Sequence, residues 1–285
     1  MKRKRGNSEI VDSYLPEECW ELAFKFFISD CDEYTSPHYL KSLSIISKEF
    51  LSITNRLRLS LTICTEAHPF LPRLLHRFTN LTSLNFTFPC NDVFSLRCGT
   101  VIADGLKNFF PKKITTLTTL ICSKFYYLDS SELVLIAYCF PNLQLLDLNN
   151  CCCISKEGMT HLLRTCSNIT HLNLTGCFGL DLLRHAMNFE VPKLKMLNLS
   201  KTFVDDETLY VISKNSSGLL QLLLEYCVVV THKGVKHMVE NCTQLRVINY
   251  RGCRRVDDNV VFSMVPSRPS LREIIGGRLS YYFSC

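Results

Sequence analysis

The sequence lacks the features that would mark a nucleic-acid-binding chain. It carries 32 Lys and Arg residues against 26 Asp and Glu residues in 285 positions. Four of the basic residues, Lys2–Arg5, lie in the first five positions, and without them the balance is 28 against 26, a net charge of +2. A broad nucleic-acid surface needs many more clustered Lys and Arg residues. We therefore expect no nucleic-acid partner.

Long apolar runs and a disulfide framework are missing as well. The run Leu133–Phe140 falls far short of the roughly 20 residues that a membrane span requires. The basic start continues into polar residues, so we expect no secretory signal. The 16 cysteines are about 5.6% of the chain, below the roughly 8–10% typical of disulfide scaffolds. We expect a cytoplasmic or nuclear protein with free thiols and no membrane partner. Lys2–Arg5 is read equally well as a nuclear-localisation signal or as part of a solvated, disordered tail over residues 1–12.

An internal repeat of 25 or 26 residues runs through the second half of the chain. Each unit begins with an L-x-x-L pattern whose first residue is Leu117, Leu143, Ile169, Leu194, Leu219, Leu245 or Leu271. The fourth position is also Leu or Ile in all seven units. Leu and Ile are about a fifth of the chain, so fourteen such coincidences have a chance probability on the order of 10⁻¹⁰.

Each unit has the pattern of a short strand, a turn and a helix. The sixth position continues the apolar alternation with Leu148, Leu174, Leu199 and Leu224. Further along each unit, apolar residues fall three or four apart and form one stripe per helix. The stripes are Met159, Leu162 and Leu163; Leu209 and Ile212; Val235, Met238 and Val239; and Val260 and Met264.

The segments Leu143–Cys151 and Ile169–Cys177 resemble the leucine-rich repeat, and specifically its cysteine-containing subtype. The resemblance covers Leu117 to about Gly276 and implies an α/β solenoid with parallel strands on the concave face and helices on the convex face. An earlier copy begins at Leu81, and the alternation of Leu59, Leu61 and Ile63 predicts a first strand.

About eight strands are therefore expected, spanning roughly 35 Å at about 4.8 Å each. The ten extra residues before Leu117 predict a longer loop between Pro89 and Lys113. At the far end Gly276-Gly277 interrupts the last unit, and either Tyr281, Tyr282 and Phe283 cover the end of the solenoid or the chain is truncated.

Residues 13–57 do not fit the repeat and precede the solenoid expected over 58–285. Leu15-Pro16 followed by two Glu residues predicts a helix start. Two further short helices are expected, the second with Ser47 as its N-cap. Leu15-Pro16-Glu17 together with Leu43–Phe50 resembles the F-box. The sequence from Ser44 to Asn55 is similar to that of plant members of the class.

The F-box resemblance implies a three-helix module that docks on a Skp-type adaptor of an SCF ubiquitin ligase. It assigns adaptor contacts to Leu15, Pro16, Trp20, Leu43, Ser47 and Phe50. The connection from Phe27 to His38 is longer than usual for the family and contains Asp30, Asp32 and Glu33. That departure puts adaptor binding in doubt.

The cysteines are interpreted as structural. Eight of them, Cys151, Cys152, Cys153, Cys166, Cys177, Cys227, Cys242 and Cys253, could suggest zinc. Zinc requires four converging ligands, whereas these thiols recur once per repeat and Thr202 occupies one of the same positions. The histidines His161, His171, His232 and His237 lie on different repeats, and no catalytic motif is present. We expect no cofactor, no metal and no catalytic site.

Partner binding is expected on the exposed strand positions, which are the third, fifth and seventh of each unit. Asn or Asp at the fifth position is common in this repeat type and indicates little about a ligand. The third and seventh positions vary more. From them the predicted target contacts are His171, Gln221, Asn149, Thr175, Ser200, Glu225 and Arg251. Glu225 and Arg251 are in adjacent repeats of one column; a pair between them would be exposed and worth about 0–1 kcal/mol, so we interpret it as surface patterning.

These features predict a substrate receptor rather than an enzyme. The module would hold the adaptor and its cullin–RING assembly, and the concave face would hold a target protein, with one copy of the chain in the hetero-complex. The alternative is a leucine-rich-repeat interaction scaffold whose F-box no longer binds an adaptor.

Overall fold

The computed structural model describes two compact units, Met1–Leu59 and Ser60–Cys285. The described residues are 15–29, 36–86, 106–107, 112–126, 128–177, 191–264, 266, 268–276 and 280–282. The predicted basic tail over residues 1–12, the acidic connection at residues 30–35 and most of the predicted loop between Pro89 and Lys113 lie outside them.

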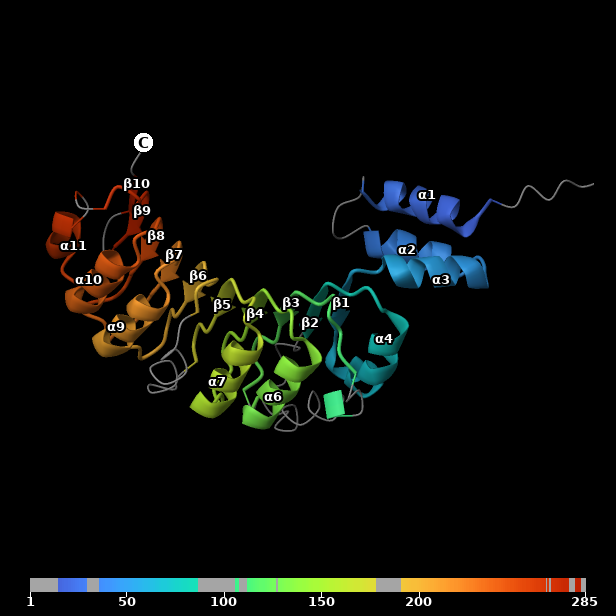
Figure 1. The fold of residues 1–285 in the computed structure, drawn as a ribbon, viewed down its shortest axis with the longest axis horizontal. Coiled ribbons are helices and arrows are strands. Elements are labelled where there is room, and N and C mark those ends of the chain that lie inside the picture. The colour runs from blue at the N-terminus through green and yellow to red at the C-terminus, as the bar shows by residue number, and fades with distance from the viewer. Residues whose placement is uncertain are drawn as a thin grey trace, which may run out of the picture. The chain divides into compact units, whose positions relative to one another are not determined.

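The first unit contains the three expected helices (Figure 1). They are α1 (Glu17–Ser29), α2 (Ser36–Ser44) and α3 (Lys48–Leu57). Pro16 lies immediately before α1, and Glu17 and Glu18 occupy its first turn, where the helix dipole favours carboxylates. Ser47 is the N-cap of α3, as predicted: its hydroxyl accepts a hydrogen bond from the backbone N–H of Phe50 at 3.0 Å. The core of this unit is formed by Phe24, Leu40 and Ile53.

The second unit is built on one ten-stranded sheet in sequential order. Its strands are β1 (Ser60–Ile63), β2 (Ser83–Phe86), β3 (Thr119–Ile121), β4 (Leu145–Asp147), β5 (His171–Asn173), β6 (Met196–Asn198), β7 (Gln221–Leu223), β8 (Val247–Asn249), β9 (Glu273–Ile275) and β10 (Ser280–Tyr282). β1 to β9 are parallel, so the expectation of about eight strands was one short.

Adjacent strands align the repeat position by position. Leu146 lies opposite Leu172, and Leu197 lies opposite Leu222. The fourth-position residues from Leu120 to Ile274 are fully buried, and the first-position residues are at most 4% exposed. A single unit could not bury this apolar face alone, so each unit depends on its neighbours for its core. The solenoid predicted from the repeat is confirmed.

The helices lie on the outer side of the arc and the strands on its inner side (Figure 1). They are the 3₁₀ helix η1 (Thr65–Phe70), α4 (Leu71–Arg77), α6 (Ser130–Cys139), α7 (Lys156–Thr165), α9 (Asp206–Asn215), α10 (His232–Asn241) and α11 (Asp258–Met264). The predicted stripes are buried in α7, α9 and α10. In α11 Val261 is 1% exposed, whereas the expected Val260 is half-buried; the burial of Met264, the other expected residue, lies outside what the structure describes.

A left-handed residue follows each of the strands β3 to β8, at the eighth position of the unit. Gly176 and Gly252 adopt this conformation, with φ of 69° and 76°. The other units use residues that carry a Cβ: Lys124, Asn150, Lys201 and Tyr226, with φ between 57° and 67°. L-residues with a side chain are strained in this region, so the turn geometry is imposed by the stacked repeats.

The last strand closes the sheet in the opposite direction. β10 pairs with β9 antiparallel, with Tyr281 opposite Ile274. The backbone of β10, which includes Tyr281 and Tyr282, therefore pairs with the edge of the last parallel strand. Phe283 lies outside the described residues. Within the described part of the chain, no helix has both the length and the apolar character to cross a lipid bilayer.

Candidate functional site

Six of the eight cysteines interpreted as structural are buried in the repeat core, whereas Cys152 and Cys153 are exposed. The thiols of Cys151, Cys177 and Cys253 donate to carbonyl oxygens of the preceding repeat at 2.9–3.2 Å. Thr202 occupies the same position in its repeat, but its hydroxyl donates within that repeat, to the carbonyl oxygen of Leu199 at 2.7 Å. Burial raises the pKa of Cys177 to about 12, which keeps it a thiol. The described residues contain no cluster of three or more His, Cys, Asp or Glu side chains able to hold a metal ion.

The three-helix unit is held together by a cluster of aromatic rings. The ring of Phe50 lies 5.0 Å from that of Trp20 and 4.9 Å from that of Phe24, measured between centroids. Phe24 is 2% exposed, whereas Trp20 and Phe50 are half-buried. Trp20 and Phe50 were predicted as adaptor contacts. Part of the surface of each ring is instead buried where α1 packs against α3.

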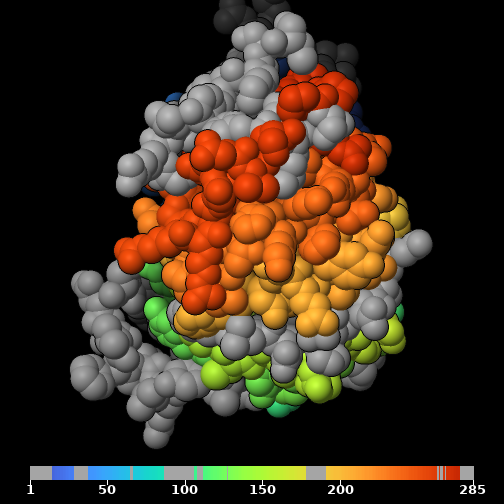
Figure 2. All heavy atoms as spheres, turned by 90° about the vertical axis from the view of Figure 1, so that its left-hand side faces the viewer, coloured from blue at the N-terminus to red at the C-terminus, as the bar shows by residue number. Residues whose placement is uncertain are grey.

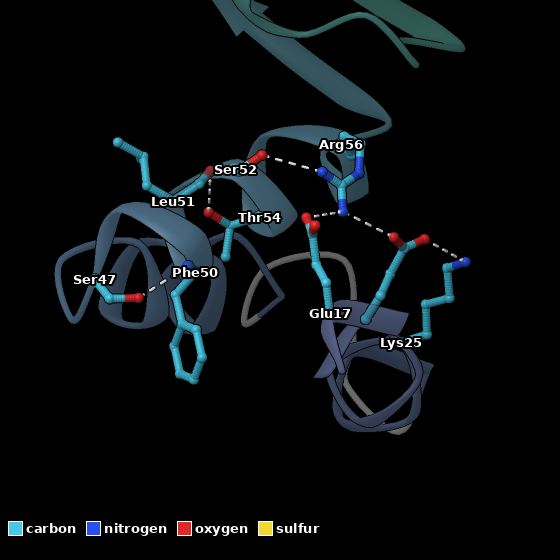
Figure 3. Close-up of polar contacts among 9 residues, drawn as sticks. Glu17, Lys25, Ser47, Phe50, Leu51, Ser52, Thr54 and Arg56 are labelled. Carbon is cyan, nitrogen blue, oxygen red and sulfur yellow. Dashed lines mark hydrogen bonds and ion pairs between the residues drawn. The ribbon is translucent and has the colours of Figure 1, made fainter. Parts of the chain in front are cut away.

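Ion pairs connect the same two helices (Figure 3). Arg56 Nη2 lies 2.7 Å from Glu17 Oε1 and 3.1 Å from Glu21 Oε2. Lys25 Nζ lies 2.8 Å from the other oxygen of Glu21. Hydrogen bonds from Lys25 and then Arg56 lower the pKa of Glu21 below its ordinary 4.5. The network fixes the start of α1 against the end of α3.

These contacts make α1 and α3 antiparallel and separate the predicted adaptor residues into two groups. Leu15 and Pro16 adjoin Glu17, which contacts Arg56. Ser47 is nine residues before Arg56, about 14 Å along α3 at 1.5 Å per residue. Leu43, which is half-buried, lies just before Ser47 at the same end. The six residues therefore span the length of the helix pair and do not form one compact cluster.

An exposed apolar stripe runs along α1 from the residue Leu15 just before it, and of its members only Leu15 was among the predicted contacts. Leu15, Cys19, Leu22 and Phe26 recur at intervals of four, three and four, which places them on one helix face. Leu15, Leu22 and Phe26 are 48%, 66% and 68% exposed. Ile45 and Ile46, in the turn before α3, are 82% and 63% exposed. The sequence carried the signal, because its apolar residues cover more of α1 than one neighbour can bury.

On the concave face, the fifth-position residues stabilise the turns. Asp147, Asn173 and Asn249 each accept a hydrogen bond from the backbone N–H two residues later, at 2.9–3.1 Å. Asn173 also donates from Nδ2 to Asp147 Oδ2 at 2.9 Å. This use within the fold explains the recurrence of Asn and Asp at that position.

The third- and seventh-position residues are placed as follows. His171 and Gln221 are exposed in the third column on β5 and β7, with Met196 of β6 between them, and Asn149 and Thr175 are half-buried in the seventh. The expectation that Ser200 is exposed was wrong: it is 5% exposed. In the next repeat the fifth position is Leu223, whose apolar side chain cannot accept the hydrogen bond from the backbone N–H two residues later. That N–H, of Glu225, donates to Ser200 Oγ instead, at 3.1 Å.

The carboxylate of Glu225, next to Arg251 in its column, is engaged by another side chain. Glu225 Oε1 accepts a hydrogen bond from Nδ2 of Asn249 at 2.6 Å. This bond draws the carboxylate toward the fifth position of the next repeat. Arg251 remains exposed, and within the described part of the chain no ion pair joins it to Glu225.

Comparison with known proteins supports the fold. No protein-family model matches the sequence. Among solved structures, a chain from the crystal structure of the Rad7 and Elc1 complex in yeast is similar, with a TM-score of 0.52 and 14% sequence identity. The likeness covers 90% of this chain and 87% of that chain. At this identity it shows that the solenoid architecture is shared.

Proposed function

We propose that this protein is the substrate-recognition subunit of an SCF-type cullin–RING ubiquitin ligase. The F-box-like unit binds a Skp-type adaptor, and the concave face of the leucine-rich repeats binds a target protein. The chain itself performs no chemistry. It raises the effective concentration of a target lysine beside the ubiquitin-carrying enzyme, which leads to ubiquitination and proteasomal degradation of the target.

The observation that carries this proposal is the exposed apolar surface of the three-helix unit. Leu22, Phe26, Ile45 and Ile46 are each more than 60% exposed, although the unit already has its own core of Phe24, Leu40 and Ile53. Several large apolar side chains left exposed on one small helical unit are typical of a surface that another protein covers. The solved chain with a similar fold also belongs to a two-protein complex, which agrees with a partner-bound role.

Adaptor binding by the full chain tests the proposal. Purified wild type should retain a Skp-type adaptor in a pull-down, and Leu15→Ala/Pro16→Ala and Leu22→Ala/Phe26→Ala should each weaken retention about tenfold or more, because exposed apolar anchors dominate such interfaces. Val134→Ala/Tyr210→Ala is the matched control, since both residues are exposed apolar side chains on helices of the solenoid. Its retention should equal that of wild type.

Trp20 provides the folding check for these variants. It is the single tryptophan of the chain and lies in the aromatic cluster of the unit, so unchanged fluorescence shows that the helices still pack. Failure of the wild-type chain to retain the adaptor would overturn the receptor proposal and leave the interaction scaffold with a non-functional F-box.

A further inference from the structure

Three exposed arginines gather in the turn that follows β8. Arg251, Arg254 and Arg255 occupy the seventh, tenth and eleventh positions of the unit that begins at Leu245, and all three are exposed. In the described part of the chain none of them makes an ion pair with a carboxylate. Residues 245–276 contain six arginines and three acidic residues. Half of the net charge of +6 therefore lies in this last stretch of the solenoid.

Apolar side chains from the preceding repeats border these arginines. The backbone N–H of Tyr226 donates to the carbonyl oxygen of Arg251 at 2.7 Å, which places Tyr226 one strand away. A Cβ on Gly252 would lie 2.5 Å from the Tyr226 ring, so the ring rests on that glycine. Val228 occupies the same repeat position as Arg254. Tyr226 and Val228 are 50% and 48% exposed, and Figure 2 looks onto this carboxyl-terminal end of the solenoid.

Tyr226 is held in an unfavourable backbone conformation. Its φ is 58°, at the turn position where the neighbouring repeat uses Gly252. A glycine would remove the strain, and a half-exposed ring recovers little free energy from burial. The same conformation recurs at the eighth position of every unit from Leu117 to Leu245, so it is a property of the repeat turn. The turn places the ring of Tyr226 against Gly252, next to Arg251 in the following repeat.

We propose that Tyr226, Val228, Arg251, Arg254 and Arg255, named here the arginine surface, bind an acidic segment of the target protein. The carboxylates of the segment pair with the guanidinium groups, for which arginine is well suited. An apolar side chain of the segment covers Tyr226 and Val228. This rests on the proposed function and specifies the chemistry of the target.

The charge distribution favours a short acidic segment over a nucleic acid. Nucleic-acid surfaces need extended rows of cations that follow a phosphate backbone. Here the unpaired arginines lie in one turn, and the chain beyond its first five residues has a net charge of only +2. The carboxylate of Glu225, in the same column as Arg251, is engaged by Asn249, and that of Asp257, two residues after Arg255, accepts a hydrogen bond from the backbone N–H of Asn259.

Fluorescence anisotropy with the full chain tests the proposal. The probe is a short labelled peptide rich in Asp and Glu with a central Leu. Wild type should bind it more tightly at low than at physiological ionic strength. Arg251→Glu/Arg254→Glu/Arg255→Glu should weaken binding about tenfold or more, and Glu225→Gln should strengthen it about twofold.

The matched control changes the net charge equally at the opposite ends of the strands. It is Lys193→Glu/Arg246→Glu/Arg272→Glu, three exposed residues that precede β6, β8 and β9, and it should retain near wild-type affinity. Equal loss in both triple variants, or no binding by wild type, would show that the arginine surface is not a specific site. Tighter binding of single-stranded DNA that is abolished by the arginine reversals would also overturn the proposal.

Adaptor retention is measured on the same variants. It should be unchanged, because the substitutions lie in the second compact unit and the adaptor surface lies in the first. Loss of peptide binding with retained adaptor, and the reverse, therefore separate failure of this inference from failure of the proposed function.

Discussion

At the residue scale, the eighth position of each unit shows how stacking overrides local preference. Six successive units place a residue with positive φ there, yet only Gly176 and Gly252 are glycines. Lys201 and Tyr226 accept the strain because the strands on either side already determine the path of the turn. The repeat therefore holds free energy that single substitutions can recover.

Lys201→Gly should stabilise the protein by about 1 kcal/mol, because the left-handed conformation costs an L-residue roughly that much. Lys201 is exposed, so little packing is lost. Urea unfolding followed by circular dichroism measures the change. Gly176→Ala is the opposing control: its φ is 69° and its new Cβ would clash with the side chain of Asn150, so it should destabilise. Equal responses of the two variants would contradict this explanation of the turn.

At the scale of elements, the Arg56 network and the aromatic cluster determine how α1 meets α3. The guanidinium contacts two carboxylates one helical turn apart and also donates from Nη1 to Ser52 Oγ at 3.0 Å. These groups are partly exposed, so their ion pairs contribute modestly, whereas the rings of Trp20, Phe24 and Phe50 supply most of the apolar contact.

Arg56→Ala should destabilise the three-helix unit by about 0.5–1 kcal/mol at neutral pH. The pKa of Glu21 is lowered in the folded state from its ordinary 4.5, so its stabilising effect is present above that value. The effect is lost as the pH falls through the lowered pKa. The difference between wild type and variant should therefore shrink in acid.

Unfolding followed by Trp20 fluorescence reports on this unit, since the chain has no other tryptophan. Lys48→Ala is the control, because Lys48 is an exposed cation of the same helix that makes no ion pair in the described residues. A pH-independent difference for Arg56→Ala would mean that the guanidinium acts through packing rather than through the carboxylates.

At the scale of the whole molecule, the solenoid is a one-dimensional stack in which each unit contacts its neighbours. The unit Leu194–Gly218 contributes β6 and α9 between β5 and β7. Leu172, Leu197 and Leu222 lie in register across these strands. Removing a complete unit should therefore bring two equivalent faces together.

Excision of residues 194–218 should leave a folded, monomeric solenoid with a lower midpoint of thermal unfolding. Excision of residues 206–218 removes α9 but keeps β6, so the core leucines beneath the helix lose their cover at about 2–5 kcal/mol each. That variant should lose cooperative unfolding. Circular dichroism and size-exclusion chromatography distinguish the two, and comparable behaviour would argue against unit-by-unit stacking.

Local periodicity accounts for the parts of the structure that could be predicted. The L-x-x-L spacing identified the solenoid, its buried leucines and most helix stripes, because alternation along a strand and a period of 3.6 along a helix are properties of the backbone. It also identified the Ser47 cap, which depends on residues three positions apart. The stripe of Leu15, Cys19, Leu22 and Phe26 could have been found by the same spacing.

Relations between neighbouring repeats could not be predicted in this way. Ser200 is buried because Leu223, on the next strand, cannot accept a turn hydrogen bond. The carboxylate of Glu225 does not pair with Arg251 because it accepts a hydrogen bond from Nδ2 of Asn249. Arg56 reaches Glu17 and Glu21 because α1 and α3 pack antiparallel. A linear pattern records which residues recur, whereas the side chains that meet across strands and helices are selected by three-dimensional packing.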